Sequence, residues 1–338
     1  MGELPRGVGV NWVVFAPEAD ATFGPPSGGY LYNHELAEAL RRLGESFLPL
    51  PQQGRGVKVF PRAELVSSSP QPSPSREERE TVVLVDALGA TDAVDVPGKK
   101  VALVHMAPPF SDGAQRFFSS VDLVVGVSAS VLDDVRERFV LSAPCRVVEA
   151  GADHFEPVTN VPNRRLLGIG HVLPHKGVLE ALEACADVPG EWSLDWLGGT
   201  DVDPEYTQQV MERRRELGLE TRVRFPGRVR REAVTKALSR CAALVSTSFR
   251  EAWGLAAVEA LVCGVPLVTW TTGGVFERAR AAGAGCFVGR GDVDRLRVGL
   301  TDALSGRAEW KAAALAVAKT FHTWDDCAQE MIAACCAP

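Results

Sequence analysis

The feature that most constrains the fold of this chain is a unit that recurs along it: a short run rich in Val, Leu and Ile, a turn with Gly or Pro, and an amphipathic stretch. This order is typical of β-α units around a parallel sheet, whose buried strands are continuous apolar runs. The strand-like runs lie at 8–15, 81–85, 100–104, 123–127 and 146–148 in the first half, and at 164–169, 192–197, 223–225, 243–247, 266–269 and 285–288 in the second. The sequence therefore predicts an α/β protein with two sheets.

Domain organisation follows from the length and from two breaker-rich segments. The 338 residues, of which 46% are hydrophobic, favour about two domains. Residues 155–163 are rich in Pro and Asn and lack helical periodicity, which predicts an interdomain linker. We expect one domain over 1–158, a second over 159–320 and a terminal helix over 321–338. The Ser- and Pro-rich stretch at 61–80 is predicted to be a loop of the first domain.

The terminal helix has a recognisable start. Thr323 is a good N-cap residue, and acidic residues follow it in the first turn. Trp324, Met331 and Ile332 would form an apolar face, which needs a surface to cover.

Composition excludes several classes of protein. A net charge of −7 argues against a nucleic-acid binder, which needs a basic face to neutralise phosphates, so no nucleic acid is expected as a partner. The eight cysteines include no C-x-x-C pair, which argues for buried free thiols in a reducing compartment rather than a zinc site or a disulfide framework. The start of the chain lacks the features of a secretory signal, and no apolar stretch reaches the roughly 20 residues that cross a bilayer. We expect a cytoplasmic protein without a transmembrane segment.

The most informative stretch runs from residue 246 to residue 277. A predicted strand ends near Thr247, and a helix is predicted to start near Leu255 and to stop at Gly264. The free amides of the helix start, with Gly254 just before it, suit a diphosphate because nothing blocks a close approach of the anion.

Two glutamates flank this helix start. Glu251 lies in the loop and can accept hydrogen bonds from sugar hydroxyls. Glu259 follows about two turns further on and can hold a second pair of hydroxyls, such as those of a ribose.

The whole constellation resembles the donor site of family 4 retaining glycosyltransferases. Glu251 and Glu259 have seven residues between them, are joined by Trp-Gly-Leu, and are followed by Ala-Leu-x-x-Gly-x-Pro-x-Val and Gly-Gly-x-x-Glu. The resemblance implies the GT-B fold, with two Rossmann-like domains facing across a cleft and a C-terminal helix that crosses back to the N-terminal domain. It also implies transfer of a hexosyl group from a nucleotide sugar, a UDP- or GDP-sugar, to the hydroxyl of a small-molecule, glycan or lipid acceptor. Retention of configuration, and no cofactor or metal, are part of the same expectation.

The resemblance assigns roles to individual residues. Lys176, in the stretch Gly170-His-Val-Leu-Pro-His-Lys-Gly177, stands where the family has the lysine that binds the diphosphate, and His171 replaces its usual Arg. His105 matches a histidine near the reacting sugar. His105, Lys176 and Glu251 are therefore the expected catalytic residues. The expected donor-binding residues are Gly28, Gly29, His171, Gly198, Gly227, Val229, Trp253, Gly254, Leu255 and Glu259.

Residues 27–34, which contain Gly28 and Gly29, are expected to form a loop before a helix at 35–43. This loop resembles the Gly-Gly loop that faces the donor phosphates in the family.

Two alternative functions stay open. The same fold could carry a nucleotide-sugar epimerase or a phosphorylase, or a binding protein that has lost turnover, for which His171 is the one argument. A metal-diphosphate site could use the D-x-D triplets at 201–203 and 292–294. We disfavour such a site because both triplets fall in predicted turns and the phosphate already has cationic and helical partners.

Overall fold

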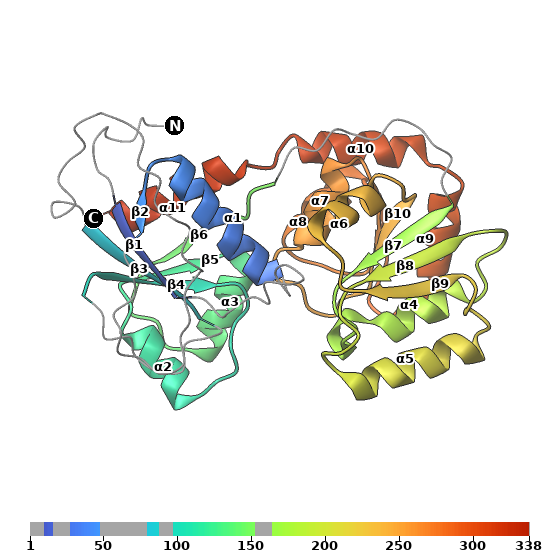
Figure 1. The fold of residues 1–338 in the computed structure, drawn as a ribbon, viewed down its shortest axis with the longest axis horizontal. Coiled ribbons are helices and arrows are strands. Elements are labelled where there is room, and N and C mark those ends of the chain that lie inside the picture. The colour runs from blue at the N-terminus through green and yellow to red at the C-terminus, as the bar shows by residue number, and fades with distance from the viewer. Residues whose placement is uncertain (1–9, 16–27, 48–79, 88–96, 153–163, 338) are drawn as a thin grey trace. The chain divides into compact units, whose positions relative to one another are not determined.

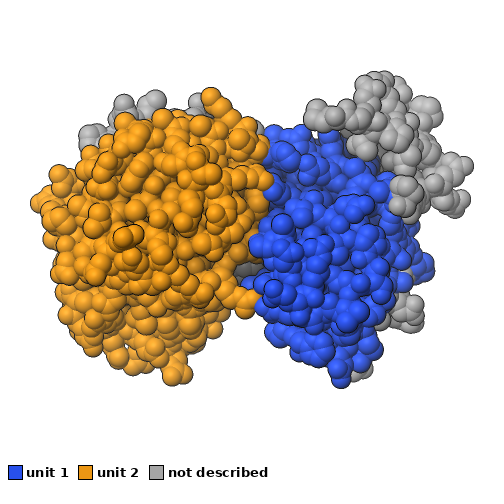
Figure 2. Space-filling model, turned by 180° about the vertical axis from the view of Figure 1, so that it is seen from behind, with its two compact units in different colours: residues 1–19, 29–151, 322–338 blue, residues 20–28, 152–321 orange. Residues whose placement is uncertain are grey.

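The computed structural model of the chain describes residues 10–15, 28–47, 80–87, 97–152 and 164–337. These residues form two compact units, coloured blue and orange in Figure 2. Unit 1 includes the described residues of 1–19, 29–151 and 322–338, and unit 2 includes Gly28 and the described residues of 152–321.

Unit 1 is built on a parallel sheet with the strand order β2-β1-β3-β4-β5-β6 (Figure 1). Its strands are β1 Val10–Phe15, β2 Ser46–Phe47, β3 Glu80–Asp86, β4 Lys99–Val104, β5 Leu123–Gly126 and β6 Cys145–Val147. Its helices, among the described residues, are α1 Gly28–Arg42, α2 Asp112–Ser119, α3 Ala129–Arg138 and α11 Trp324–Cys336. Helices cover both faces of the sheet, which is why Val101 to Val104 of β4 are all buried instead of alternating between inside and outside.

Unit 2 repeats the plan with the strand order β12-β11-β10-β7-β8-β9, again all parallel. Its strands are β7 Arg165–Ile169, β8 Ser193–Leu197, β9 Val223–Gly227, β10 Ala243–Ser246, β11 Leu267–Thr269 and β12 Gly285–Phe287. Its helices are α4 Val178–Cys185, α5 Pro204–Glu216, α6 Arg231–Leu238, α7 Leu255–Val262, α8 Val275–Ala282, α9 Val293–Leu304 and α10 Ala308–Ala318. Helix α4 packs with α5 and α9 on one face, and α7 packs with α6, α8 and α10 on the other.

Every strand predicted from the sequence is present, with bounds that differ by two residues at most where the structure describes them. The sequence missed only β2 among the described strands. This strand has two residues, Ser46 and Phe47, and pairs with β1 at the edge of the sheet. A run that short has no pattern that could be recognised.

The start of α1 corrects one expectation. The loop expected at 27–34 and the helix expected at 35–43 are instead one helix that begins at Gly28. Tyr32, Leu36 and Leu40 are spaced by four residues and are all buried, so the apolar face of the helix extends well before residue 35. The two glycines suggested a loop because Gly is a weak helix former, but packing outweighs propensity here.

Helix α11 belongs to unit 1, although it follows unit 2 in the sequence. Thr323 caps it in a capping box: Thr323 Oγ1 accepts a hydrogen bond from the Asp326 amide, and the Asp326 carboxylate accepts one from the Thr323 amide. Trp324 lies edge-on against Tyr32 of α1, with ring centroids 5.6 Å apart. Lys99 Nζ donates to the carbonyl oxygens of Cys335 and Ala337 at 2.6 and 3.0 Å. The C-terminal helix therefore returns to the N-terminal unit, as the predicted fold class requires.

Several expectations fall outside the described residues. These are the linker at 155–163, the domain boundary after residue 158, and the loop at 61–80 except for Glu80, which begins β3. They stay predictions. Within the described ranges, no helix is both long and apolar enough to span a membrane.

Candidate functional site

The strand order of unit 2 places two loops side by side. The chain winds from β7 outward through β8 to β9, and then returns to add β10 on the other side of β7. β7 and β10 are parallel neighbours, with Leu167 opposite Leu244, so the loops that follow them leave the same edge of the sheet in opposite directions. Such a point, where the strand order reverses, is the place where open α/β sheets bind ligands.

The loop after β7 is fastened to the loop after β10. Thr247 Oγ1 donates to the carbonyl oxygen of Lys176 at 3.0 Å, and the Phe249 amide donates to the carbonyl oxygen of His175 at 2.8 Å. Gly177 adopts a left-handed conformation with φ of +63°, and a Cβ at this position would lie 2.1 Å from the Thr247 carbonyl oxygen. The two loops therefore lie so close together that only glycine fits at residue 177.

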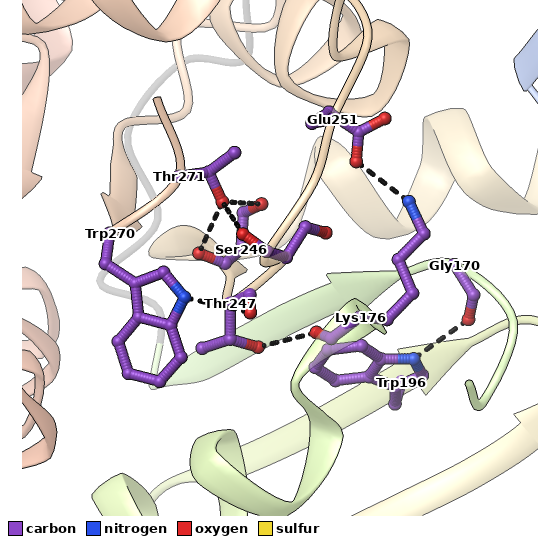
Figure 3. Close-up of polar contacts among 9 residues, drawn as sticks. Gly170, Lys176, Trp196, Ser246, Thr247, Glu251, Trp270 and Thr271 are labelled. Carbon is purple, nitrogen blue, oxygen red and sulfur yellow. Dashed lines mark hydrogen bonds and ion pairs between the residues drawn. The ribbon is translucent and has the colours of Figure 1, made fainter. Parts of the chain in front are cut away.

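Buried hydrogen bonds between the loop after β10 and residues 270 and 271 hold this loop in place, as Figure 3 shows. Trp270 Nε1 donates to the Thr247 carbonyl oxygen at 2.9 Å. Thr271 Oγ1 lies 3.1 Å from the carbonyl oxygen of Ser248 and 3.2 Å from Ser246 Oγ. Thr247, Trp270 and Thr271 are at most 2% exposed, so these hydrogen bonds are shielded from water. They fix the position from which the next residues of the loop project.

Lys176 and Glu251, one from each loop, form an ion pair. Lys176 Nζ donates to Glu251 Oε2 at 2.8 Å, and 20% of the lysine side chain and 23% of the glutamate side chain are exposed (Figure 3). A Cβ on Gly170 would lie 3.4 Å from Lys176 Cδ and Cε, so the aliphatic part of the lysine rests on bare backbone. The structure thus joins two of the three residues expected to be catalytic in one ion pair.

The helix start beside Glu251 has the predicted geometry. Gly254 precedes α7 with φ of +95°, and a Cβ there would lie 2.6 Å from the Phe276 ring. Leu255 is the first helical residue, so its amide and that of the next residue point out of the helix without a partner from the preceding turn. Trp253 is buried with Arg278 stacked 5.2 Å from its ring, and its Nε1 has no hydrogen-bond partner within the described part of the chain.

Glu259 lies in α7 and pairs with a residue of the preceding helix. Its Oε1 is 3.2 Å from a terminal nitrogen of Arg231, the first residue of α6, and 16% of the glutamate side chain is exposed. The ion pair with Arg231, at the start of α6, thus orients the Glu259 carboxylate.

His171 is in its neutral form. Its Nδ1 accepts a hydrogen bond from the Gly199 amide at 2.9 Å, which a doubly protonated ring could not do. Burial lowers the pKa of His171, and the nearby charges of Arg228 and Lys176 lower this pKa further. His171 therefore contributes no positive charge at neutral pH.

The three remaining residues of unit 2 that are expected to bind the donor lie at the ends of β8 and β9: Gly198 follows β8, Gly227 ends β9 and Val229 lies just beyond it. Gly198 has φ of +154°, and a Cβ there would lie 2.0 Å from the Gly170 carbonyl oxygen, so the packing of the two loops requires glycine. Gly227 has φ of +81° and open space where a Cβ would be, and Val229 is half-buried. Gly198 and Gly227 are joined by a backbone hydrogen bond of 3.0 Å.

His105 belongs to a buried network in unit 1. Its Nε2 lies 2.9 Å from Asn33 Oδ1, and Asn33 Nδ2 donates to Asp86 Oδ2 at 2.9 Å. Because the Asn33 amide group must direct its nitrogen at the carboxylate, its oxygen faces His105, and Nε2 carries the ring proton. Gly28 and Gly29, also expected in this part of the site, are the first two residues of α1.

Comparison with known proteins identifies the part of the chain that carries the Lys176–Glu251 pair. Residues 151–317 match the family described as Glycosyl transferases group 1. This segment is a group 1 glycosyltransferase domain. Among curated proteins, a mannosylfructose-phosphate synthase from Agrobacterium fabrum is 27% identical over 248 residues, which are 70% of this chain and 48% of that protein. A D-inositol 3-phosphate glycosyltransferase from Mycolicibacterium paratuberculosis is 31% identical over 175 residues, which are 49% of this chain and 38% of that protein. The chain spans less than half the length of these relatives.

Solved structures resemble the chain over nearly its whole length. Sucrose-phosphate synthase from Thermosynechococcus elongatus has a TM-score of 0.72 at 18% identity and covers 97% of this chain and 98% of its own. Anabaena Alr3699/HepE, in complex with UDP and glucose, has a TM-score of 0.71 at 17% identity and covers 96% of this chain and 98% of its own. The fold is GT-B, as the sequence predicts.

The D-x-D triplets of the group 1 domain have protein partners in the structure. Asp203 and Asp292 cap α5 and α9, each accepting a hydrogen bond from an amide of the first turn. Asp201 pairs with Arg228, and Asp294 pairs with Arg297. In the described ranges, no group of three His, Cys, Asp or Glu side chains is arranged to hold a metal ion.

Besides Arg278, which stacks on Trp253, sequence reasoning missed two further arginines of the group 1 domain that lie against predicted site residues. Arg231 holds Glu259, and Arg228 lies beside His171 and Gly199. The carboxylates these arginines pair with lie 28 and 27 residues away along the chain, so no local motif indicates either pair.

Acidification is expected to destabilise the protein through His105. Burial lowers the pKa of His105 below its usual 6.5, and the opposing effect of Asp86 is smaller. The unfolded chain therefore binds the proton first, and the free energy of unfolding falls as the pH drops below about 6.5. Urea titrations at about pH 7.5 and about pH 5.5 should show this loss, and the loss should be smaller in His105→Gln, where His171 and His175 still contribute. Equal losses in the two proteins would contradict the assignment.

Proposed function

We propose that the chain is a retaining glycosyltransferase, which moves a hexosyl group from a nucleotide diphosphate sugar to the hydroxyl of a small-molecule, glycan or lipid acceptor. The observation that carries the proposal is the Lys176–Glu251 pair beside the start of α7, at the point where the strand order of the sheet reverses. A cation, free helix amides and a carboxylate stand together there, and a nucleotide sugar needs all three.

In this proposal Lys176 and the first amides of α7 stabilise the leaving diphosphate. Negative charge grows on the phosphate oxygen as its bond to the sugar breaks, and donors held in place beforehand stabilise that charge without reorganisation. The lysine is fixed by its packing on Gly170 and by the hydrogen bond from Thr247 to its carbonyl oxygen. The proposal therefore assigns the charge to protein groups and includes neither a cofactor nor a metal.

Glu251 acts as a placeholder for the diphosphate before the donor binds. Its carboxylate forms an ion pair with the Lys176 ammonium group. An entering diphosphate competes for the same ammonium group and frees Glu251 to accept hydrogen bonds from sugar hydroxyls. Glu259, oriented by Arg231, binds the ribose hydroxyls. His105, neutral and with its proton on Nε2, keeps Nδ1 as a hydrogen-bond acceptor, and its role near the reacting sugar stays a prediction.

The donor is proposed to be a UDP- or GDP-sugar. The Anabaena protein of similar fold has been solved with UDP and glucose and with UDP-glucose, which makes UDP-glucose the first compound to test. All eight cysteines are free thiols, which supports the cytoplasm as the proposed location.

Nucleotide sugars are expected to stabilise the folded protein. A ligand at 100 times its Kd adds about 2.7 kcal/mol to the free energy of unfolding if it binds only the native state. A thermal-shift series with UDP-, GDP- and ADP-sugars should therefore single out one donor. That donor should raise the melting temperature of Glu259→Gln less than that of the wild type. The proposal would be overturned if no nucleotide sugar raised the melting temperature and none were consumed.

Phosphorus NMR of the same samples separates the alternatives. A transferase releases the nucleoside diphosphate, and it does so slowly even without an acceptor, when the sugar is transferred to water. An epimerase instead returns an intact nucleotide sugar. A binding protein without turnover shifts the melting temperature and releases nothing. A pyridoxal-phosphate-dependent phosphorylase would show the absorbance of its cofactor in pure protein.

A further inference from the structure

One side of the proposed donor site is short of positive charge. His171 faces this side, but its Nδ1 accepts the Gly199 amide and the ring is neutral. Lys176 already shares its charge with Glu251. A nucleotide diphosphate brings more than one negative charge, so a further cation close to His171 would strengthen its binding.

Arg228 lies in the required position. It follows β9 directly, and its guanidinium group lies beside Gly199 in the loop after the neighbouring strand β8. A Cβ on Gly199, the second residue after the end of β8, would lie 2.8 Å from His171 Nδ1, 2.9 Å from Asp201 Oδ1 and 3.1 Å from Arg228 Cζ. The loops after β7, β8 and β9 therefore bring these three side chains together around one bare glycine.

Backbone contacts connect this cluster to Lys176. Lys176 rests on Gly170, and Gly198 abuts the Gly170 carbonyl oxygen, while Trp196 Nε1 donates to the same oxygen at 2.9 Å (Figure 3). The backbone segments at Gly170 and Gly198 thus pack directly between Lys176 and the cluster of Arg228, His171 and Asp201. The depressed pKa of His171, to which both Arg228 and Lys176 contribute, agrees with this proximity.

The present partner of Arg228 can be displaced. One terminal nitrogen of Arg228 donates to Asp201 Oδ2 at 2.8 Å, but 66% of the Asp201 side chain is exposed, and an ion pair in that setting is weak. Only 27% of the Arg228 side chain is exposed, and its Nε is buried with no hydrogen-bond partner among the described residues. A guanidinium group has five N–H donors in a planar fork, so it can grip a phosphate with those that Asp201 leaves.

We propose that Arg228 is the second phosphate-binding cation of this site and supplies, from the loop after β9, the positive charge that His171 does not provide. The inference rests on the proposed function, because it assumes that a nucleoside diphosphate binds beside Lys176. It goes beyond that function by naming Arg228, in the loop after β9, as a residue that binds the phosphates.

The test compares diphosphate and nucleoside binding. UDP and GDP are titrated calorimetrically into the full chain, and the tighter of the two is then compared with its nucleoside, uridine or guanosine. Arg228→Ala should weaken diphosphate binding about ten- to a hundredfold, the range for losing a charge-assisted hydrogen bond, and leave nucleoside binding unchanged. Arg228→Lys, which keeps the charge without the fork, should lose less and also guards against a folding defect in the alanine variant.

Arg224 provides a matched control. It lies in β9, four residues before Arg228, and pairs with Asp195 through two hydrogen bonds of 2.7 and 2.9 Å. Arg224→Ala therefore removes an equivalent Arg–Asp pair from the same strand region, and it should leave diphosphate binding as in the wild type. In the reverse direction, His171→Arg added to Arg228→Ala should recover part of the lost affinity.

Three results would overturn the inference about Arg228. They are an unchanged diphosphate affinity in Arg228→Ala, an equal loss for the nucleoside and the diphosphate, and a double variant as weak as the single one. Each of these requires that the wild type binds a nucleoside diphosphate. If the wild type bound neither UDP nor GDP, the proposed function would fail together with the inference, so the two failures are distinguishable.

Discussion

Replacing Lys176 by Ala is expected to lower turnover at saturating donor about 100-fold. In the proposed mechanism the lysine is a donor fixed in advance toward the oxygen on which charge develops, and deleting one such donor costs about 3 kcal/mol of transition-state stabilisation. The measurement is kcat for release of the nucleoside diphosphate. Lys176→Met should behave in the same way, since its side chain keeps the packing on Gly170 but has no charge.

The control for Lys176 is Lys236→Ala, which removes an exposed lysine from α6 of the same unit and should leave kcat unchanged. Urea titrations of all three variants establish that each is folded under the assay conditions. A kcat close to that of the wild type in Lys176→Ala would show that another cation carries the phosphate charge. Arg228 would then be the first residue to examine.

Gly177→Ala is expected to destabilise the protein by about 3 kcal/mol or more, the largest effect on stability that we predict. Two costs add: the left-handed backbone, at about 1–2 kcal/mol for a residue with a Cβ, and the clash of that Cβ with the Thr247 carbonyl oxygen 2.1 Å away. The carbonyl cannot retreat, because it also accepts the hydrogen bond from Trp270 Nε1.

Gly218→Ala separates the two costs. Gly218 has φ of +65°, almost the same as Gly177 at +63°, but nothing lies within 4 Å of a Cβ placed there. This variant should lose about 1–2 kcal/mol, from the backbone conformation alone. Urea unfolding of both variants gives the difference, and equal losses would mean that the two loops move apart at no cost.

The strands could be predicted because each is a short apolar run that is buried on both faces. In β5, Leu123 to Val125 are all buried, and nothing in their sequence competes with a central strand. Helix α1 shows where this reasoning fails. Its first turn contains Gly28 and Gly29, so local propensity indicated a loop, while the buried face that continues through Tyr32 stabilises a helix.

The part of the candidate site that lies in one loop could be predicted, because its residues follow one another in the sequence. Glu251, Gly254 and the start of α7 follow one another along the chain, and the structure has the expected loop and helix start. The ion pair from Lys176 to Glu251 spans 75 residues, and the pair from Arg228 to Asp201 joins the ends of neighbouring strands. Such contacts depend on the order of strands in the sheet, which residue spacing does not determine.

The membership of α11 in unit 1 has a consequence for synthesis on the ribosome. Apart from Gly28 and Ala152, the described residues of unit 2 form one continuous stretch from 164 to 321, whereas unit 1 is assembled from residues on both sides of that stretch. A growing chain can therefore complete unit 2 first, while Tyr32 and the start of unit 1 must wait for Trp324 to leave the exit tunnel. The early part of unit 1 spends that interval with an uncovered apolar face, which is the kind of surface that chaperones bind during translation.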